Sequence, residues 1–499
     1  MTTPEQTQVR HLAAIDLGSN SFHMLVVRIL HDDVQQLFKY KERVRLAEGL
    51  DAKKRLSDES IEFGVSVLRN FAEQLKPLDE CEVRVVATHT LRVAENRQRF
   101  LAAARKVFPY PIEIVSGQEE ARLVYLGVNE TEHLDGNTLV FDIGGGSTEI
   151  AIGSGGEMLI GRSHTMGAVS FTQRFFNDGI DKKAYKRAKI AAMQQLERSI
   201  PLFNTQNWDH VRATSGTAQA IISASEGLGY PPNTLTLESL RQIRDYILEQ
   251  DWDTKVFKNI TPERQQVMVG GVAVMEAILE GLNVTEATFS SGALREGVVS
   301  EVLSQGGAAD RRTRSIDSLL MRYHVDTEHA ERVSQSAMRF WDQLAGSWNF
   351  TPAFRGFLNY AARVHEVGLN ISSSGMHKHS AYIIENSNLP GFGLEHQQLL
   401  ATLVRLHRKR LRFDILPELQ LVSDQEIIGL VLALRLAVVW HINRNPNPPD
   451  LPLLHTDGNK LTLQLPANFC EEHPLLFADL EREVDLCAQA RIKLKLESI

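Results

Sequence analysis

The sequence predicts an α/β protein in which two similar α/β blocks are followed by a helical region. An apolar run that ends in an Asp and a Gly-rich turn occurs twice, as Leu12–Ile15 with Asp16–Ser21 and as Thr138–Phe141 with Asp142–Thr148. Each turn leads into another strand-like run rather than a helix. Helical periodicity dominates residues 310–440, where strand signals are few. These observations predict a duplicated α/β fold joined to a mostly helical part.

The individual elements follow from local patterns. A helix is expected to begin at Ser57-Asp58-Glu59 and to end at Leu75, before Pro77. Strands are expected at 12–16, 22–30, 82–87, 111–115, 148–152, 210–214, 286–290 and 460–465. Further helices are expected at 182–199, 262–280 and near 475–488, and linkers at 304–308 and after 441.

Length and composition restrict the class of protein. At 499 residues the chain is expected to hold three or four domains of roughly 100–200 residues each. It has no run of the roughly 20 apolar residues that a transmembrane segment needs, and its N-terminus lacks the apolar core of a secretory signal. Three scattered cysteines fit a reducing cytoplasm. The net charge of -8 argues against nucleic-acid binding, so a polyanionic ligand would need local basic patches.

The two Gly-rich turns are typical of a phosphate site. Without a side chain, glycine lets the backbone approach a ligand and direct several N–H groups at phosphate oxygens. An Asp beside phosphates suits a magnesium ion, because the carboxylate would repel the phosphates themselves. Asp16 has the alternative of capping its own turn. Because each turn joins two strands, a Walker loop, which leads into a helix, is not expected.

Two adjacent acids, Glu119 and Glu120, begin a helix after Gly117. Neighbouring helical residues point roughly 100° apart, so only one of the two can face a given site. Glu119 lies three residues before Arg122 and is expected to pair with it on the surface, which leaves Glu120 to face inward. The alternative is that both acids only stabilise the helix N-terminus.

These segments together resemble the exopolyphosphatase / guanosine pentaphosphate phosphohydrolase family. Ala14–His23 and Val140–Glu149 look like its two phosphate motifs. Further similar segments in the first half are Thr88–Arg92, Ser116–Arg122, Ser215–Thr217 and Gly292–Gly297. In the second half, His365–Asn370 and Asn386–Phe392 look like long bacterial exopolyphosphatases, so the resemblance covers nearly the whole chain.

The resemblance implies a four-part architecture. Two ribonuclease-H-like (actin-like ATPase) domains in tandem, 1–135 and 136–308, would precede a mostly α-helical HD-like domain, 309–440, and a small α+β domain, 441–499. The His-Asp pair of metal-dependent HD domains is replaced by His365-Glu366, so a degenerate HD-like domain without its own metal is expected. His377 and His379 are then core or surface residues. A homodimer is also implied, in the cytoplasm, with peripheral membrane association left open.

The resemblance also implies the roles of individual residues. Glu120 matches the proposed catalytic base, and partial burial should raise its pKa. Arg92 would add a cation at the transferred phosphate. The phosphate-binding residues would be Gly18, Ser19, Asn20, Ser21, Gly144, Gly145, Gly146, Ser147 and Thr148. Magnesium would be held by Asp142 and Glu149, with Asp16 as a third candidate, and activation by K⁺ is left open. The alternatives are an ordinary surface arginine for Arg92 and an outward-facing strand carboxylate for Glu149.

A dense basic run lies in the helical region of this acidic chain. It comprises Arg405, His407, Arg408, Lys409 and Arg410, with Arg412 close by. It is expected to be either a solvated helix face or a channel for long polyphosphate, whose binding would release counterions. A second cluster, from Lys182 to Lys189, indicates a plain exposed helix face.

The expected activity is processive exopolyphosphatase, with inorganic polyphosphate as the substrate and orthophosphate as the product. Gly144–Gly146 and the His377–His379 segment favour this activity over guanosine pentaphosphate 5′-phosphohydrolase, although dual activity fits as well. A non-catalytic polyphosphate or alarmone sensor is the alternative from another class, and the intact Glu120, Asp142 and Glu149 argue against it. Ser215–Thr217 and Gly292–Arg295 resemble the adenosine-binding loops of the wider superfamily, but closing the second block is the favoured role for them here.

Overall fold

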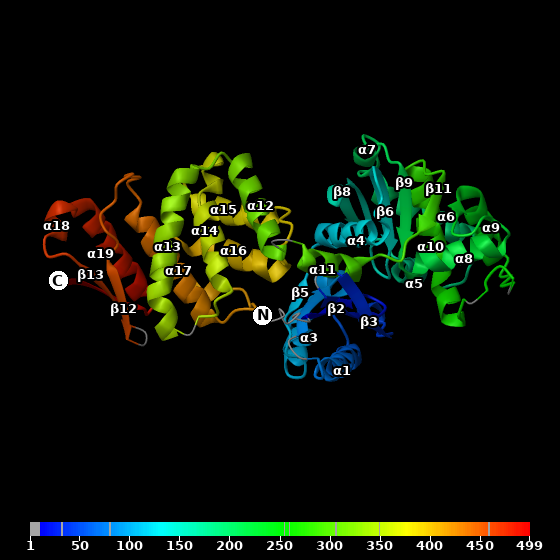
Figure 1. The fold of residues 1–499 in the computed structure, drawn as a ribbon, viewed down its shortest axis with the longest axis horizontal. Coiled ribbons are helices and arrows are strands. Elements are labelled where there is room, and N and C mark those ends of the chain that lie inside the picture. Colours follow the sequence, from blue (N-terminus) through cyan, green and yellow to red (C-terminus); the bar gives the residue numbers. More distant parts are fainter. Residues whose placement is uncertain are drawn as a thin grey trace, which may run out of the picture. The chain divides into compact units, whose positions relative to one another are not determined.

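The chain folds into two compact units, Met1–Gly307 and Ala308–Ile499 (Figure 1). The computed structural model describes residues 10–499 apart from 31–32, 79–80, 254, 259, 305–306, 349 and 458–459. The division falls within the predicted linker 304–308, of which 305–306 lie outside the described residues. Residues 307 and 308 are already helical, as the start of α12 (Gly307–Arg322). The finer division into four domains stays a prediction.

The first sheet of unit 1 has the order β3-β2-β1-β4-β5. Its strands are β1 (Arg10–Leu17), β2 (Phe22–Leu30), β3 (Asp33–Glu42), β4 (Cys81–Ala87) and β5 (Ile112–Ile114). β1, β2 and β3 form an antiparallel meander, while β4 and β5 run parallel to β1. The sequence predicted these strands except β3, whose polar residues gave no strand signal.

The second sheet repeats this arrangement. Its order is β10-β11-β9-β6-β7-β8, with β6, β7 and β8 as the antiparallel meander and β9 and β11 parallel to β6. Its strands are β6 (Asn137–Ile143), β7 (Thr148–Ser154), β8 (Glu157–His164), β9 (His210–Thr214), β10 (Leu235–Thr236) and β11 (Glu286–Phe289). Only β10 has no counterpart in the first sheet. The predicted duplication is therefore confirmed at the level of strand order and direction.

The two Gly-rich turns are hairpin turns, as predicted. Leu17 pairs with Phe22 across the first hairpin, and Ile143 pairs with Thr148 across the second. Each turn follows the carboxyl end of a strand with a parallel neighbour, β4 beside β1 and β9 beside β6. Ligands of open α/β sheets bind at such strand ends, so the topology places both turns where a site is expected.

Besides α4 (Gly117–Glu132), ten helices and a 3₁₀ turn are described in unit 1. The predicted helix at 57–75 is α1, and the Oγ atom of Ser57 caps it by accepting from the N–H of Ser60. The helices are α1 (Asp58–Leu75), α2 (His89–Val93), α3 (Arg97–Arg105), α5 (Ala168–Phe175), α6 (Lys182–Leu196), α7 (Ile200–Phe203), α8 (Ser215–Gly227), α9 (Leu237–Leu248), α10 (Pro262–Gly281) and α11 (Leu294–Leu303); the 3₁₀ turn is Leu46–Gly49.

Helix α4 (Gly117–Glu132) packs closely against α11 and between the two sheets. Their shared core joins Leu12 of β1, Val140 of β6 and Val298 of α11. A Cβ on Gly297 would lie 1.8 Å from the carbonyl oxygen of Leu123, so the two helices meet backbone to backbone. This packing fixes α4, whose first turn carries Glu119 and Glu120.

Unit 2 is helical apart from one small sheet. Its helices are α12, α13 (Thr327–Trp348), α14 (Phe354–Val364), α15 (Met376–Asn386), α16 (Leu394–Leu406), α17 (Asp424–Trp440), α18 (Phe469–Glu472) and α19 (Pro474–Gln489), with 3₁₀ turns at Val367–Asn370 (η2) and Phe413–Ile415. The sheet has the order β12-β13-β14, from Leu453–Asp457, Lys460–Leu465 and Lys493–Ser498. No helix in the described parts of the chain is long and apolar enough to cross a bilayer.

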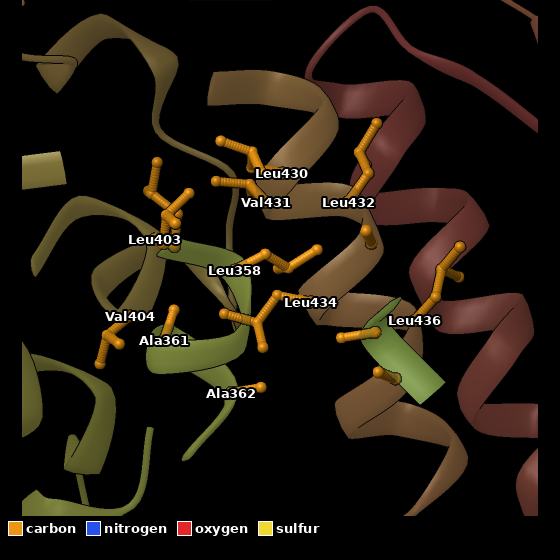
Figure 2. Close-up of a cluster of buried hydrophobic side chains, with 14 of the residues drawn as sticks. Leu358, Ala361, Ala362, Leu403, Val404, Leu430, Val431, Leu432, Leu434 and Leu436 are labelled. Atoms are coloured by element: carbon orange, nitrogen blue, oxygen red, sulfur yellow. The ribbon is translucent and has the colours of Figure 1, made fainter. Parts of the chain in front are cut away.

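The core of unit 2 is continuous from the helices to the sheet. Leu358 of α14, Leu403 of α16 and Leu434 of α17 are buried together, as Figure 2 shows. The same cluster includes Leu461 and Leu463 of β13. The residues after 441 therefore share their hydrophobic core with the helices that precede them.

Candidate functional site

Both Gly-rich turns line one pocket in unit 1 with a volume of about 480 Å³. Its walls come from the carboxyl ends of β1 and β6 and from the N-terminal parts of α4, α8, α10 and α11. The residues of the turns that line it are Gly18, Ser19, Asn20, Ser21, Gly144, Gly145 and Ser147. The volume lies within the range of small-molecule sites.

Close approach of the two turns explains their glycines. A Cβ on Gly145 would lie 3.3 Å from the Cβ of Ser19, and a Cβ on Gly18 would lie 2.9 Å from the carbonyl oxygen of Ser21. Gly146 also serves packing, because a Cβ there would lie 2.4 Å from the ring of His89. The turns therefore face each other directly, and glycine is required by neighbouring protein atoms as well as by any ligand.

Backbone carbonyl oxygens of both turns are engaged by protein N–H groups. The carbonyl of Asn20 accepts from the N–H groups of Val44 and Arg45, and that of Gly145 accepts from those of Val169 and Ser170. Oxygen atoms directed into the pocket would repel a phosphate. Because these carbonyls are held by neighbouring backbone, the turns suit an anion.

Four carboxylates line the pocket: Asp16, Glu120, Asp142 and Glu149. Burial, with a smaller contribution from the Glu120 carboxylate, raises the pKa of both Asp16 and Asp142 to about 7. Burial raises the pKa of Glu149 well above its ordinary value, and the neighbouring carboxylates of Glu120 and Asp142 add to this rise. Such a concentration of negative charge is costly without cations and marks a candidate functional site.

Glu120 faces the pocket, as predicted, and pairs with Arg92. The Nη1 atom of Arg92 donates to Oε2 of Glu120 at 2.8 Å and to the carbonyl of Val115 at 3.0 Å. Burial raises the pKa of Glu120 and Arg92 opposes this rise, so the expected increase is confirmed. Arg92 itself is not among the residues described as lining the pocket, so its contact with a phosphate stays a prediction.

Glu119 pairs with Arg122, but the prediction that they meet on the surface is wrong. Arg122 donates to both oxygens of Glu119, at 2.8 and 2.7 Å, and the two residues are only 4% and 3% exposed. Arg122 also pairs with Glu301 of α11, which in turn pairs with Arg84 of β4. The pair is buried because α11 covers this face of α4.

Three cations in the pocket were not singled out from the sequence. They are Lys41 at the end of β3, Arg264 of α10 and Arg295 of α11. Arg295 lowers the pKa of Asp16, in opposition to burial. Arg295 could have been found through the segment Gly292–Gly297, whereas Lys41 lies on a strand that gave no signal.

The loops after β9 and β11 meet at the pocket. The Oγ1 atom of Thr214 donates to the carbonyl of Gly292 at 2.7 Å, and Arg264 donates to the carbonyl of Gly216 at 2.7 Å. Ser215 has a φ of 85°, a strained conformation for a side chain-bearing residue, and its Oγ atom donates to the carbonyl of Ile143 at 2.9 Å. These loops both close the second half of unit 1 and line the pocket.

Two predicted phosphate-binding residues point elsewhere. Gly146 lies against His89, and the buried hydroxyl of Thr148 donates to the carbonyl of Met166. Neither residue is among those described as lining the pocket. Residues at both ends of a hairpin turn alternate in direction, so only part of such a turn can face one ligand.

The basic run of unit 2 is not a helix face. α16 ends at Leu406, and the segment that follows it carries Arg408, Lys409 and Arg410. His407 is 1% exposed, and its Nδ1 atom bonds the carbonyl of Val404 at 2.6 Å, so it cannot line a surface channel. Arg405 lies in the last turn of α16 and is half-buried.

The basic cluster of α6 is exposed at Lys182, Lys183, Lys186 and Arg187, as predicted. Lys189, in contrast to these exposed residues, is half-buried and pairs with Glu276 at 2.9 Å and Glu280 at 2.7 Å.

The carboxylates of the pocket do not form a compact metal cage. Across the described residues, one group of three or more histidine, cysteine or acidic side chains has its ligand atoms within 4.8 Å of one another, and it lies in unit 2. Magnesium commonly uses one or two protein carboxylates together with phosphate oxygens. The Oδ1 atom of Asp16 is buried and has no hydrogen-bond partner in the described structure. Asp16, Asp142 and Glu149 therefore fit such a shared site.

Comparison with known proteins identifies related sequences over both units. The sequence model of the Ppx/GppA phosphatase family matches residues 25–305, and that of Ppx/GppA phosphatase domain III matches residues 311–484. A guanosine-5′-triphosphate,3′-diphosphate pyrophosphatase from Aeromonas hydrophila subsp. hydrophila is 38% identical over 95% of this chain and 96% of its own.

Solved structures match about three fifths of this chain. The Aquifex aeolicus member of the Ppx/GppA protein family is 25% identical with a TM-score of 0.51, over 60% of this chain and 99% of that chain. An exopolyphosphatase from Cytophaga hutchinsonii has a TM-score of 0.54 over 59% of this chain and 98% of that chain. At 22% identity the latter similarity shows the fold alone.

Proposed function

Since the chain belongs to the Ppx/GppA phosphatase family and is a hydrolase of phosphoanhydrides, we propose that it removes the terminal 5′-phosphate of guanosine 5′-triphosphate 3′-diphosphate. The sequence favoured inorganic polyphosphate as the substrate. The name of the Aeromonas relative, which spans both units, supports the nucleotide instead.

The observation that carries this proposal is the extent of the pocket. Beyond the two turns it continues between the loops after β9 and β11, where Met268 and Phe289 add apolar surface. Lys41, Arg264 and Arg295 line the same pocket. A nucleoside with two phosphate groups needs both features, apolar surface for the base and cations for the second phosphate arm. A linear polyphosphate needs only the cations.

The chemistry follows from the placement of Glu120. Its carboxylate takes a proton from water, and the water oxygen attacks the terminal phosphorus. The bond from that phosphorus to the bridging oxygen breaks, the bridging oxygen stays on the nucleotide, which becomes guanosine 5′-diphosphate 3′-diphosphate, and the phosphoryl group is released with the water oxygen as orthophosphate. Arg92 holds Glu120 in place, and the raised pKa of Glu120 makes it a stronger base near neutral pH.

Magnesium is part of the proposal. Asp142 and Glu149, with Asp16, would hold Mg²⁺, whose charge offsets that of the phosphate oxygens. The ion also accounts for the carboxylates, because a nearby divalent cation lowers their pKa values and relieves their mutual repulsion.

Inorganic polyphosphate remains a second candidate substrate because of one feature of unit 2. Arg408, Lys409 and Arg410 are close in sequence after α16, and Lys409 and Arg410 are exposed. Binding of a long anion to such residues would release counterions and depend on salt. We also propose that the chain forms a homodimer and that unit 2 comprises HD-like helices followed by a small α+β domain.

The experiment compares orthophosphate release from guanosine 5′-triphosphate 3′-diphosphate and from long polyphosphate, each with Mg²⁺, using the full chain. We expect a kcat/KM at least about tenfold higher for the nucleotide, a difference of about 1.4 kcal/mol. The Glu120→Gln variant should lose both activities. Faster hydrolysis of polyphosphate would overturn the nucleotide assignment, while release from neither substrate would count against both.

A further inference from the structure

Unit 2 contains a buried cluster of side chains that the proposed hydrolysis does not use. His329 comes from the first turn of α13, and His365 and Glu366 lie between α14 and η2. One ligand atom from each of the three lies within 4.8 Å of the others. His329 is 4% exposed and His365 1%, so two imidazoles and a carboxylate meet in the interior.

Hydrogen bonding prepares His365 to bind a cation. Its Nδ1 atom lies 2.7 Å from the carbonyl oxygen of Ala362, which can only accept, so Nδ1 carries the proton. The Nε2 atom therefore has a free lone pair, and it lies 4.0 Å from Oε1 of Glu366. Metal-binding histidines are commonly oriented in this way, by donating the other N–H to a backbone carbonyl.

His329 supplies a second, independent observation. Its Nδ1 atom is buried and has no hydrogen-bond partner within the described structure. A buried polar atom without a partner is destabilising and rare in folded proteins, so such an atom calls for an explanation. A bound cation would satisfy it.

Glu366 is held by Arg444 and still has coordinating capacity. The Nη2 atom of Arg444 lies 2.6 and 2.7 Å from the two oxygens of Glu366, and Nη1 lies 3.0 Å from Asp326. A carboxylate has about four lone-pair sites, so each oxygen retains one for a metal. Arg444 thus fixes the orientation of the carboxylate beside the two rings.

We propose that His329, His365 and Glu366 bind one divalent transition-metal ion of the Zn²⁺ class. Two imidazole nitrogens and a carboxylate oxygen are a recurrent donor set for Zn²⁺ and Fe²⁺, whereas Mg²⁺ prefers oxygen ligands alone. The ion joins α13 to the α14–η2 junction and so stabilises the helical unit. This proposal replaces the expectation, drawn from the His-Glu pair, that the helical region has no metal of its own.

The test uses the full chain, stripped with a chelator and dialysed against Zn²⁺. We expect one ion per chain whose X-ray absorption spectrum shows two imidazole ligands, and a higher melting temperature on Zn²⁺ addition. His329→Gln and His365→Gln should each weaken binding at least about tenfold. His455→Gln, which changes an exposed histidine of β12, should bind as the wild type does.

Asp142→Asn separates this ion from one in the catalytic pocket, because that variant should retain the imidazole-bound Zn²⁺. Absence of an imidazole-bound ion in the wild-type protein would overturn the proposal, and this result does not depend on any variant folding. Equal Zn²⁺ affinity in His329→Gln and wild type would overturn it as well.

Discussion

Glu119 and Glu120 are neighbours on one helix, and both are buried beside an arginine, yet their surroundings differ. Glu119 belongs to a network in which Arg122 pairs with both Glu119 and Glu301. Arg84 in turn pairs with Glu301 and Glu113. Glu120 has Arg92, but it shares the pocket with Asp16, Asp142 and Glu149. On one face of α4 each carboxylate of the network therefore pairs with an arginine, whereas in the described part of the pocket Arg92 pairs with Glu120 and the other three carboxylates have no arginine or lysine within ion-pair distance. Pairing favours stability, and unpaired carboxylates favour the binding of cations.

The largest expected effect is on catalysis, from Glu120→Gln. Removing the base should lower kcat by about 10²–10⁴-fold, because general-base catalysis contributes about that factor. The melting temperature should stay the same or rise, since a buried negative charge is lost. Glu119→Gln is the matched control: it should lower the melting temperature and preserve kcat per folded molecule. A similar loss of kcat in both variants would contradict the assignment of catalysis to Glu120 and of stability to Glu119.

The next effect is on stability, from Glu301→Gln. This change leaves two buried arginines with one carboxylate fewer, and breaking a buried ion pair costs about 3–5 kcal/mol. Urea unfolding measures the loss. Glu82→Gln breaks an exposed pair with Arg10 and should cost less than about 1 kcal/mol. Similar losses in the two variants would show that the network on α4 does not stabilise unit 1.

Asp142→Asn should stabilise unit 1 at high pH while it lowers activity. The pKa of Asp142 is raised from 3.8 to about 7, so its share of stability is present below pH 4 and is lost as pH rises through 7. Without Mg²⁺, the variant should therefore exceed wild type by about 1–3 kcal/mol at pH 8 and match it at pH 4. Unfolding at both pH values checks the sign. A variant less stable than wild type at pH 8 would contradict this account of the pocket.

The smallest effect is expected on the pH dependence of kcat in Arg295→Gln, measured at saturating substrate because Arg295 also lines the pocket. Arg295 lowers the pKa of Asp16, so its loss should raise that pKa and move the acidic limb of the activity profile upward by up to about one pH unit. Lys182→Gln removes an exposed positive charge from α6 and should leave the profile in place. If the pH–activity profile is unchanged in Arg295→Gln, then Asp16 is not the group whose ionisation limits activity at low pH.

The sequence predicted the elements that repeat or alternate and missed those set by tertiary packing. The hairpins at Gly18–Ser21 and Gly144–Ser147 were predictable because apolar runs flank each turn. The inward direction of Glu120 followed from helical geometry. The burial of Arg122 could not be predicted, because its partner Glu301 is distant in sequence and α11 covers both. For the same reason, Lys41 and Arg264 reach the pocket from elements with no motif.

Chemical rescue of Glu120→Ala tests the central claim, that Glu120 is the catalytic base of the pocket. Orthophosphate release from guanosine 5′-triphosphate 3′-diphosphate is measured with and without formate, a small carboxylate that fits the space vacated by the side chain. We predict that formate raises the rate of Glu120→Ala at least about tenfold and leaves the rate of Asp142→Ala unchanged. Turnover near the wild-type rate in Glu120→Ala without formate would contradict the claim.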